Sequence, residues 1–342
     1  MAVIDSHLHV WARPDQWREF PFRNQLLAGD RKVKPEAPGV AGNVDWLLEE
    51  MKQSGVAGAL IVQPSEAHHF DHSYVTSVIK ARPGIFVGCL LADPRPGQDG
   101  LAEMERLIVK EGYRAVRFHP YRWPEGESMA NELGMALFKQ AGNLKAPVGF
   151  MCFHGLLPQL PAIKALMAHS PETQVMVDHF GFCSMGDLQT ESWQALLSLA
   201  SYPQVHVKLS AFFRVTQQPW PYMDARPAIR KLVDTFGANR CMWGTDFPFV
   251  NSNGCGYHQA WQILEEGDKL EGRVLLSPDE EYWISSGTCQ KLLPAGAKPL
   301  LAADVDGETH AVVHDSHATV SGCSLTGSER TRGQPSRVLR HS

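Results

Sequence analysis

Eight short apolar runs recur along the chain, and longer amphipathic stretches separate them. Both faces of a parallel sheet are covered in a folded protein, so its strands read as continuous hydrophobic segments. The runs lie at residues 3–4, 59–62, 86–91, 115–118, 148–153, 175–177, 205–209 and 240–243. Each run is therefore predicted to form one buried strand.

The stretches between these runs place apolar residues three and four positions apart, which is typical of helices that bury one face. In the first stretch Leu47, Leu48 and Met51 have this spacing, and Gly55 follows as a suitable helix terminus. The predicted helices span residues 43–54, 101–110, 131–144, 156–168, 192–200, 226–236 and 278–293. Strands that alternate with helices predict a parallel α/β sheet, closed into a (β/α)8 TIM barrel, with an open doubly wound sheet as the alternative.

The pattern divides the chain into one domain and a tail. The barrel is expected to occupy residues 1–294, and a long aperiodic stretch at residues 13–38 is expected to cover its mouth. Residues 295–342 are rich in Ser, Thr, Gly, Arg and His and contain few aromatic residues. Such a segment buries too little apolar surface to offset its chain entropy, so a disordered tail without a catalytic role is predicted.

Composition narrows the classes of partner and compartment. A net charge of -5 argues against nucleic acid, which needs a basic surface. No apolar stretch approaches the length of a membrane span, and the first strand begins where a secretory signal would stand. The seven cysteines are scattered, and Cys89 lies inside an apolar run, as expected of buried thiols in a reducing compartment. We expect a cytoplasmic protein that binds a small molecule; the sequence is also compatible with a homo-oligomer.

Polar and ionisable residues gather where the predicted strands end. In a barrel the C-terminal ends of the strands carry function, so these residues are the candidates for chemistry. In chain order they are Asp5, His7, His9, Gln63, His68, His69, Asp71, His72, Asp93, Arg117, His119, His154, Asp178, His179, Lys208, Ser210 and Asp246. Their distribution over nearly all strands is typical of a barrel enzyme.

The pair His7-x-His9 is the most informative of these features. Residues two apart on a strand point to the same side, so both imidazoles can share one metal ion or one substrate. Asp246 at the last strand could bind a metal ion or take a proton from an attacking water molecule. The structural alternatives are two core histidines and an aspartate that caps the following helix.

Four further residues are candidates for binding the substrate. Arg117 offers a planar fork suited to a substrate carboxylate, and a core ion pair with Asp178 or Asp93 is the alternative. His154 and His119 follow the fifth and fourth strands, and His68 belongs to a histidine-rich loop after the second. His179, at the end of the sixth strand, could bind a metal ion or polarise a carbonyl group.

Three motifs together resemble the amidohydrolase superfamily, in particular its lactonase branch around 2-pyrone-4,6-dicarboxylate lactonase. They are Ile4-Asp5-Ser6-His7-Leu8-His9-Val10-Trp11, Val177-Asp178-His179 and Met242-Trp243-Gly244-Thr245-Asp246-Phe247-Pro248. The resemblance covers about residues 3–293 and extends to uncharacterised plant and algal members of the family.

The resemblance implies a distorted (β/α)8 barrel and a role for each matching residue. His7 and His9 would be the pair on the first strand, His179 the histidine on the sixth, and Asp246 the general base. His154 maps onto the family's histidine on the fifth strand. Members with two metal ions carry a bridging Lys or Glu on the fourth strand, where this chain has Arg117-Phe118-His119, so at most one ion is expected. His7, His9, His179 and Asp246 would hold it, with Zn2+ as the first candidate, although some lactonases of this branch use no metal.

The expected reaction is hydrolysis of a small cyclic ester. Asp246 would activate the water molecule, the three histidines would stabilise the oxyanion, and Arg117 would orient an acidic group of the substrate. Three alternatives stay open at this stage. They are decarboxylation of an aromatic or unsaturated acid by the same residues, a barrel that binds a small molecule without converting it, and a glycosidase that pairs Asp93 with Asp246.

Overall fold

The computed structural model describes residues 2–22 and 42–293 of the chain. Eight strands form one sheet in chain order, and each pairs in parallel with the next. They are β1 (Val3–Leu8), β2 (Val56–Val62), β3 (Phe86–Leu91), β4 (Tyr113–Phe118), β5 (Val148–Phe150), β6 (Val175–Val177), β7 (Val205–Ser210) and β8 (Cys241–Gly244). All eight predicted strands are thereby confirmed.

The sheet curves until its last strand meets its first. Just beyond β8, the amide of Asp246 donates a hydrogen bond to the carbonyl of His7 at 2.8 Å, and the amide of His9 donates to the carbonyl of Phe247 at 2.7 Å. The pairings of β1 with β2 and of β3 with β4 contain register shifts. The result is a nearly closed, distorted barrel, as predicted.

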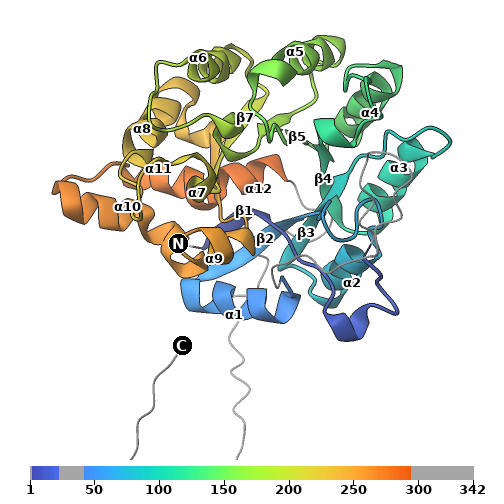
Figure 1. Ribbon diagram of the computed structural model, residues 1–342, viewed down its shortest axis with the longest axis horizontal. Coiled ribbons are helices and arrows are strands. Elements are labelled where there is room, and N and C mark those ends of the chain that lie inside the picture. The colour runs from blue at the N-terminus through green and yellow to red at the C-terminus, as the bar shows by residue number, and fades with distance from the viewer. Residues whose placement is uncertain (1, 23–41, 294–342) are drawn as a thin grey trace, which may run out of the picture. The chain divides into compact units, whose positions relative to one another are not determined.

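The helices surround the strands (Figure 1). They are α1 (Val44–Ser54), α2 (Ser73–Ala81), α3 (Gly100–Lys110), α4 (Glu132–Asn143), α5 (Leu160–His169), α6 (Glu191–Ser198), α7 (Phe212–Val215), α8 (Ala225–Phe236), α9 (Phe249–Asn253), α10 (Tyr257–Glu271), α11 (Pro278–Tyr282) and α12 (Thr288–Leu292). Helix α1 shows why the sequence predicted its ends. The side chain of Asn43 accepts a hydrogen bond from the amide of Trp46, and Gly55 adopts the left-handed conformation after the last turn.

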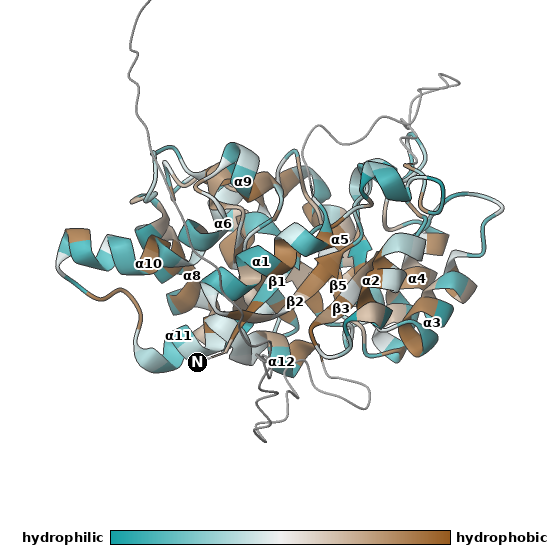
Figure 2. Cartoon of the chain, turned by 90° about the horizontal axis from the view of Figure 1, so that it is seen from below, coloured by the Kyte–Doolittle hydropathy of each residue, from teal (hydrophilic) through white to brown (hydrophobic). Residues whose placement is uncertain are grey.

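The barrel has an apolar layer inside and another between the strands and the helices. Alternate strand residues such as Ile4, Leu60 and Val62 belong to the inner cluster, which Leu292 and Leu293 at the end of α12 complete. The residues between them pack outward against the helices. In Figure 2 the central strands are coloured mostly as hydrophobic, whereas the helices alternate between hydrophobic and hydrophilic residues. This layering leaves the C-terminal ends of the strands for polar side chains.

Some expectations concern segments that the structure does not describe. The predicted tail at 295–342 lies outside the described residues, and so does most of the stretch at 13–38, so both stay predictions together with the domain boundary at 294. Among the described residues, none of the helices has the length and hydropathy needed to cross a membrane.

Candidate active site

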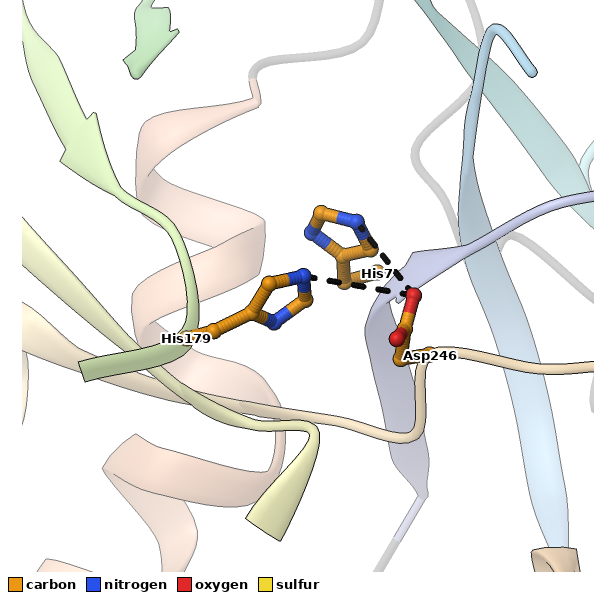
Figure 3. A group of neighbouring side chains, drawn as sticks. All are labelled: His7, His179 and Asp246. Atoms are coloured by element: carbon orange, nitrogen blue, oxygen red, sulfur yellow. Dashed lines mark ion pairs between the residues drawn. The ribbon is translucent and has the colours of Figure 1, made fainter. Parts of the chain in front are cut away.

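Three ionisable side chains from distant parts of the chain meet at the C-terminal ends of the strands. His7 lies on β1, His179 directly follows β6, and Asp246 follows β8. Figure 3 shows the three side chains pointing toward one another, with the Asp246 carboxylate as the common partner of both rings. All three side chains are buried. The sequence prediction that these residues meet at one site agrees with this geometry.

Distances identify one oxygen atom as the centre of the group. Oδ1 of Asp246 lies 3.4 Å from Nε2 of His9 and 3.9 Å from Nε2 of both His7 and His179. The other carboxylate oxygen, Oδ2, accepts a hydrogen bond from Nε of Arg214 at 2.7 Å. Asp246 does not cap α9, whose N-terminus has no side-chain cap. The carboxylate therefore faces the histidines and not a helix.

The ring nitrogens that face away from Asp246 have their own partners. Nδ1 of His9 donates to the carbonyl of Val62 at 2.8 Å, since a carbonyl can only accept. Nδ1 of His179 and the hydroxyl of Ser210 share a hydrogen bond of 2.8 Å. These contacts fix the ring orientations and leave Nε2 of each ring directed at Asp246.

A second carboxylate lies on the opposite side of His7. Oδ1 of Asp178 is 3.0 Å from Nζ of Lys208 and 3.4 Å from Nδ1 of His7, and Oδ2 accepts from Arg117 at 3.4 Å. Arg117 and Lys208 also contact the two ring nitrogens of His7, each at 3.2 Å. The core ion pair of Arg117 with Asp178, one of the two readings of the sequence, is thus present.

Burial and charge set the protonation states of the group. Burial lowers the pKa of His7 and of His179 well below the ordinary value, and the positive charge of Lys208 lowers the pKa of His7 further. Burial alone would raise the pKa of Asp246, but charge interactions with His179 and Arg214 hold it below the ordinary value. At neutral pH the site consequently contains an ionised aspartate beside the neutral rings of His7 and His179.

Strained backbone accompanies these side chains. Asp246, His179 and Ala211 have φ values of 64°, 51° and 51°, in the left-handed region that residues other than glycine rarely adopt. Such conformations cost of order 1–3 kcal/mol each and persist where the surrounding structure enforces them. Their concentration around one carboxylate is typical of a functional site.

A pocket of about 400 Å³ opens above this group. Its lining includes Asp246, His9 and Arg214 from the buried group, together with side chains of the loops after β2, β4 and β5. Those loop residues are Glu66, His119, Tyr121, Arg122, Met151, Phe153 and His154. The pocket gives a small molecule direct access to the carboxylate.

The residues predicted to bind the substrate fall into different places. Arg117, His119 and His154 line the pocket. His154 belongs to the exposed rim, because β5 ends at Phe150 and not at residue 153. It contacts the ring of Tyr121 at 4.7 Å and does not join the buried group, contrary to its mapping as the histidine of the fifth strand.

His68 does not fit its predicted role in substrate binding. Its ring is buried between Phe22 and Tyr74, and its Nε2 accepts a hydrogen bond from the amide of Ala12 at 3.2 Å. It is absent from the pocket lining. The position suits a residue that anchors the N-terminal segment against the barrel.

Sequence reasoning did not select two residues that the structure brings into the site, Arg214 and Glu66. Arg214 lies on the four-residue helix α7 and Glu66 on the loop after β2, and no periodic signal marks a side chain that enters the pocket from such short segments. Their contributions depend on how the loops meet in the folded protein.

A family model described as amidohydrolase matches residues 4–295, and the chain belongs to this family. The barrel is therefore that of the amidohydrolase family. L-fucono-1,5-lactonase of Burkholderia ambifaria is 32% identical over 104 residues, or 30% of this chain and 36% of that protein. The chain thus matches little more than a third of that relative. 4-Sulfomuconolactone hydrolase of Hydrogenophaga intermedia is 25% identical over 289 residues, or 81% of this chain and 83% of that protein.

Solved structures share the fold. A Pseudomonas putida protein described as a 2-pyrone-4,6-dicarboxylic acid hydrolase has a TM-score of 0.66 at 23% identity, covering 85% of this chain and 97% of that one. An amidohydrolase from Burkholderia multivorans with bound zinc has a TM-score of 0.60 at 19% identity, covering 86% of this chain and 100% of that one. At these identities the likeness demonstrates the barrel alone.

The donor atoms of the buried group are those of a zinc site. One ligand atom each from His7, His179 and Asp246 lies within 4.8 Å of the others, and Nε2 of His179 is buried without a hydrogen-bond partner. The surroundings fit a dication less well. Each ring nitrogen of His7 already faces a cationic donor, Nε2 that of Arg117 and Nδ1 that of Lys208, both at 3.2 Å.

The charges around the buried group also disfavour a divalent cation. Arg117, Lys208 and Arg214 supply three positive charges, whereas Asp178 and Asp246 supply two negative ones. A divalent cation would add to this positive surplus, while a developing negative charge would offset it. The arrangement therefore fits an oxyanion better than a metal ion.

Proposed function

We propose that the protein hydrolyses a small lactone, with Asp246 as the general base. One observation carries the proposal: an ionised carboxylate lies among three imidazoles at the base of a pocket sized for a small molecule. The names of two relatives, a fuconolactonase and a sulfomuconolactone hydrolase, support a cyclic ester as the substrate. Water is the second substrate.

The reaction begins with a water molecule held between Asp246 and the lactone carbonyl. Oδ1 of Asp246 accepts one proton as the water oxygen bonds to the carbonyl carbon, and the carbonyl oxygen becomes an oxyanion. When the tetrahedral intermediate collapses, the bond to the ring oxygen breaks. The proton on Asp246 passes to that leaving oxygen, so the product is an open-chain hydroxy acid and the carboxylate is regenerated.

The side chains around Asp246 prepare the site for this charge movement. Arg214 holds Oδ2 at 2.7 Å and leaves Oδ1 directed at the water. His179 donates from Nε2 to the oxyanion when the hydroxyl of Ser210 donates to Nδ1. Arg117 and Lys208 add positive charge behind His7. Groups fixed in a buried site stabilise a transition state without having to reorganise.

Activity assays test this proposal directly. The purified protein is screened with a pH indicator against sugar lactones and lactones that carry carboxylates, since each ring opening releases acid. Ring opening well above the spontaneous rate is expected, without release of CO2, which would indicate decarboxylation. A protein that accelerates no lactone in the panel would contradict the proposal.

The same preparation tests the role of a metal. Dialysis against a chelator, checked by metal analysis, is expected to leave turnover within about twofold of its value before dialysis. The reason is that the charged side chains supply the oxyanion stabilisation. Loss of activity on chelation, restored by Zn2+, would overturn the metal-free mechanism and leave lactone hydrolysis in place.

A further inference from the structure

Among the described residues, the charged side chains that line the pocket leave one carboxylate without a cationic partner. Arg214 is paired with Asp246, and Arg117 with Asp178. Glu66, on the loop after β2, lines the same pocket and accepts a hydrogen bond from the hydroxyl of Ser65 at 2.9 Å. An acidic group with free acceptor positions is therefore available to a molecule that enters the pocket.

The Glu66 carboxyl group is ionised at neutral pH, and its residue is exposed at the rim of the pocket. Partial desolvation opposes ionisation, but nearby positive charge such as that of Arg117 outweighs it and lowers the pKa of the carboxyl group below the ordinary value. Within the described part of the chain, Arg117 pairs with Asp178 and Arg214 with Asp246, so neither arginine neutralises Glu66. The carboxylate is thus negative and available to a ligand.

Arg122 is the cationic counterpart of Glu66 in the pocket. Its guanidinium donates to the backbone carbonyl of Ser65 at a long 3.4 Å, and its Nε is buried without a hydrogen-bond partner. It forms no ion pair with a carboxylate among the described residues. Within the described part of the chain, Glu66 and Arg122 consequently offer a ligand a free acceptor and a free donor.

We propose that Glu66 determines specificity and selects a neutral, polyhydroxylated lactone over a lactone that carries a carboxylate. One hydroxyl group of the ligand donates to Glu66, and a neighbouring hydroxyl accepts from Arg122. A ligand carboxylate at this place meets Glu66 with like charge, which weakens its binding relative to that of a hydroxyl group. The inference rests on the proposed hydrolysis of lactones and names the substrate class within it.

The rest of the pocket wall is consistent with such a ligand. Tyr121, Phe153 and Phe249 contribute aromatic surface, which packs against the C–H groups of a hydroxylated ring while its hydroxyls reach the polar side. His119 adds no competing charge, because burial and the nearby Arg117 lower its pKa to about 3. Among the described residues of this lining, Glu66 is therefore the carboxylate that no cationic side chain neutralises.

A matched pair of substrates tests the proposal. The five-membered lactones of gluconic acid and glucaric acid differ only in that a carboxylate replaces a CH2OH group. The wild-type protein is expected to show a kcat/KM at least about tenfold higher for the gluconic lactone. Glu66→Gln is expected to reduce this ratio about tenfold, chiefly by improving turnover of the glucaric lactone.

Glu125→Gln is the matched control, since Glu125 is exposed, lies outside the pocket lining and alters the net charge equally. The ratio of kcat/KM for the gluconic lactone to kcat/KM for the glucaric lactone should be the same in Glu125→Gln as in the wild type. A wild-type preference for the glucaric lactone, or an unchanged ratio in Glu66→Gln, would overturn the proposal while lactone hydrolysis stands.

Binding separates this inference from the proposed reaction. The cyclic ether analogues of the two lactones contain no ester, and calorimetry measures their affinity without turnover. The hydroxylated ether should bind the wild-type protein more tightly than its carboxylated counterpart, and Glu66→Gln should narrow the difference. Tighter binding of the carboxylated ether would contradict the role of Glu66 even if no lactone were hydrolysed.

Discussion

The two sides of the barrel mouth hold their charged side chains in different ways. On the side formed by β1, β6, β7 and β8, the side chains of His7, Lys208 and Asp246 are almost completely buried, and each contacts several charged or polar neighbours. On the side formed by the loops after β2, β4 and β5, Glu66 and Arg122 have few partners and His154 is exposed.

This difference suggests a division of labour. A group that moves a proton needs a fixed position, which short strands and buried ion pairs provide. A group that selects a substrate has to exchange water for ligand, which loops with unsatisfied donors and acceptors allow. The variants below test this division, in order of decreasing effect.

Asp246→Asn should produce the largest effect. The amide cannot accept the proton from water, so kcat should fall about a thousandfold while KM changes little. Steady-state kinetics on any lactone that the screen identifies will measure it. Asp234→Asn, an exposed substitution in an ion pair with Arg230, is the control and should leave kcat unchanged. Near-normal turnover in Asp246→Asn would remove Asp246 from the mechanism.

Lys208→Met should destabilise the fold strongly. The substitution leaves Asp178 buried with a weaker set of partners, and breaking a buried ion pair costs about 3–5 kcal/mol of unfolding free energy. Urea denaturation will measure the loss, and exposed Lys110→Met is the control. The double variant Lys208→Met with Asp178→Asn should recover part of the stability, because no unpaired carboxylate remains. No recovery would mean that packing, and not charge, explains the loss.

The rigid side of the mouth was also the more predictable one. Each strand end follows an apolar run, so the sequence alone predicts that His7, His179 and Asp246 lie together. The loop side offers no such rule. His154 was predicted to end a strand that stops at Phe150, and no pattern in the sequence marks Glu66 as a residue of the pocket.

The helices show the same limit of sequence reasoning. The pattern predicted α1 and α3 to within a residue at each end. It missed α2 because the histidine-rich segment before Ser73 was interpreted as part of a longer loop. Tyr74, Val75 and Val78 of α2 are nevertheless buried. It also missed α10 (Tyr257–Glu271), in which Gly267 and many polar residues interrupt the apolar period.

His154→Ala should have a small effect, and on binding alone. His154 is exposed at the rim and contacts Tyr121 through its ring, so KM should rise about threefold while kcat stays within about twofold. His154→Phe preserves an aromatic ring and should restore KM. A large decrease in kcat would instead give His154 the catalytic role that its place in the sequence first suggested.

The smallest expected effect is that of pH on kcat. The pKa of Asp246 is held below its ordinary value of 3.8, so the base stays deprotonated as the pH falls, and His7 and His179, with pKa values well below 6.5, stay neutral. Between about pH 8 and pH 5, kcat should therefore change less than about threefold after correction for spontaneous hydrolysis. An acid limb near pH 6.5 would show that a histidine titrates during turnover.

The free energy of unfolding has to be measured alongside that profile. Unlike kcat, it should decrease as the pH falls. Burial lowers the pKa of His69 and of His72 to about 4, so both rings are neutral in the folded protein and protonated in the unfolded chain below pH 6.5. Each such histidine removes about 1.4 kcal/mol of stability per pH unit as the pH falls below that value. Asp5, whose pKa burial raises to about 6, partly opposes this loss. A flat kcat together with a falling urea midpoint would locate the acid sensitivity in the buried histidines of the fold and not in the base that attacks the lactone.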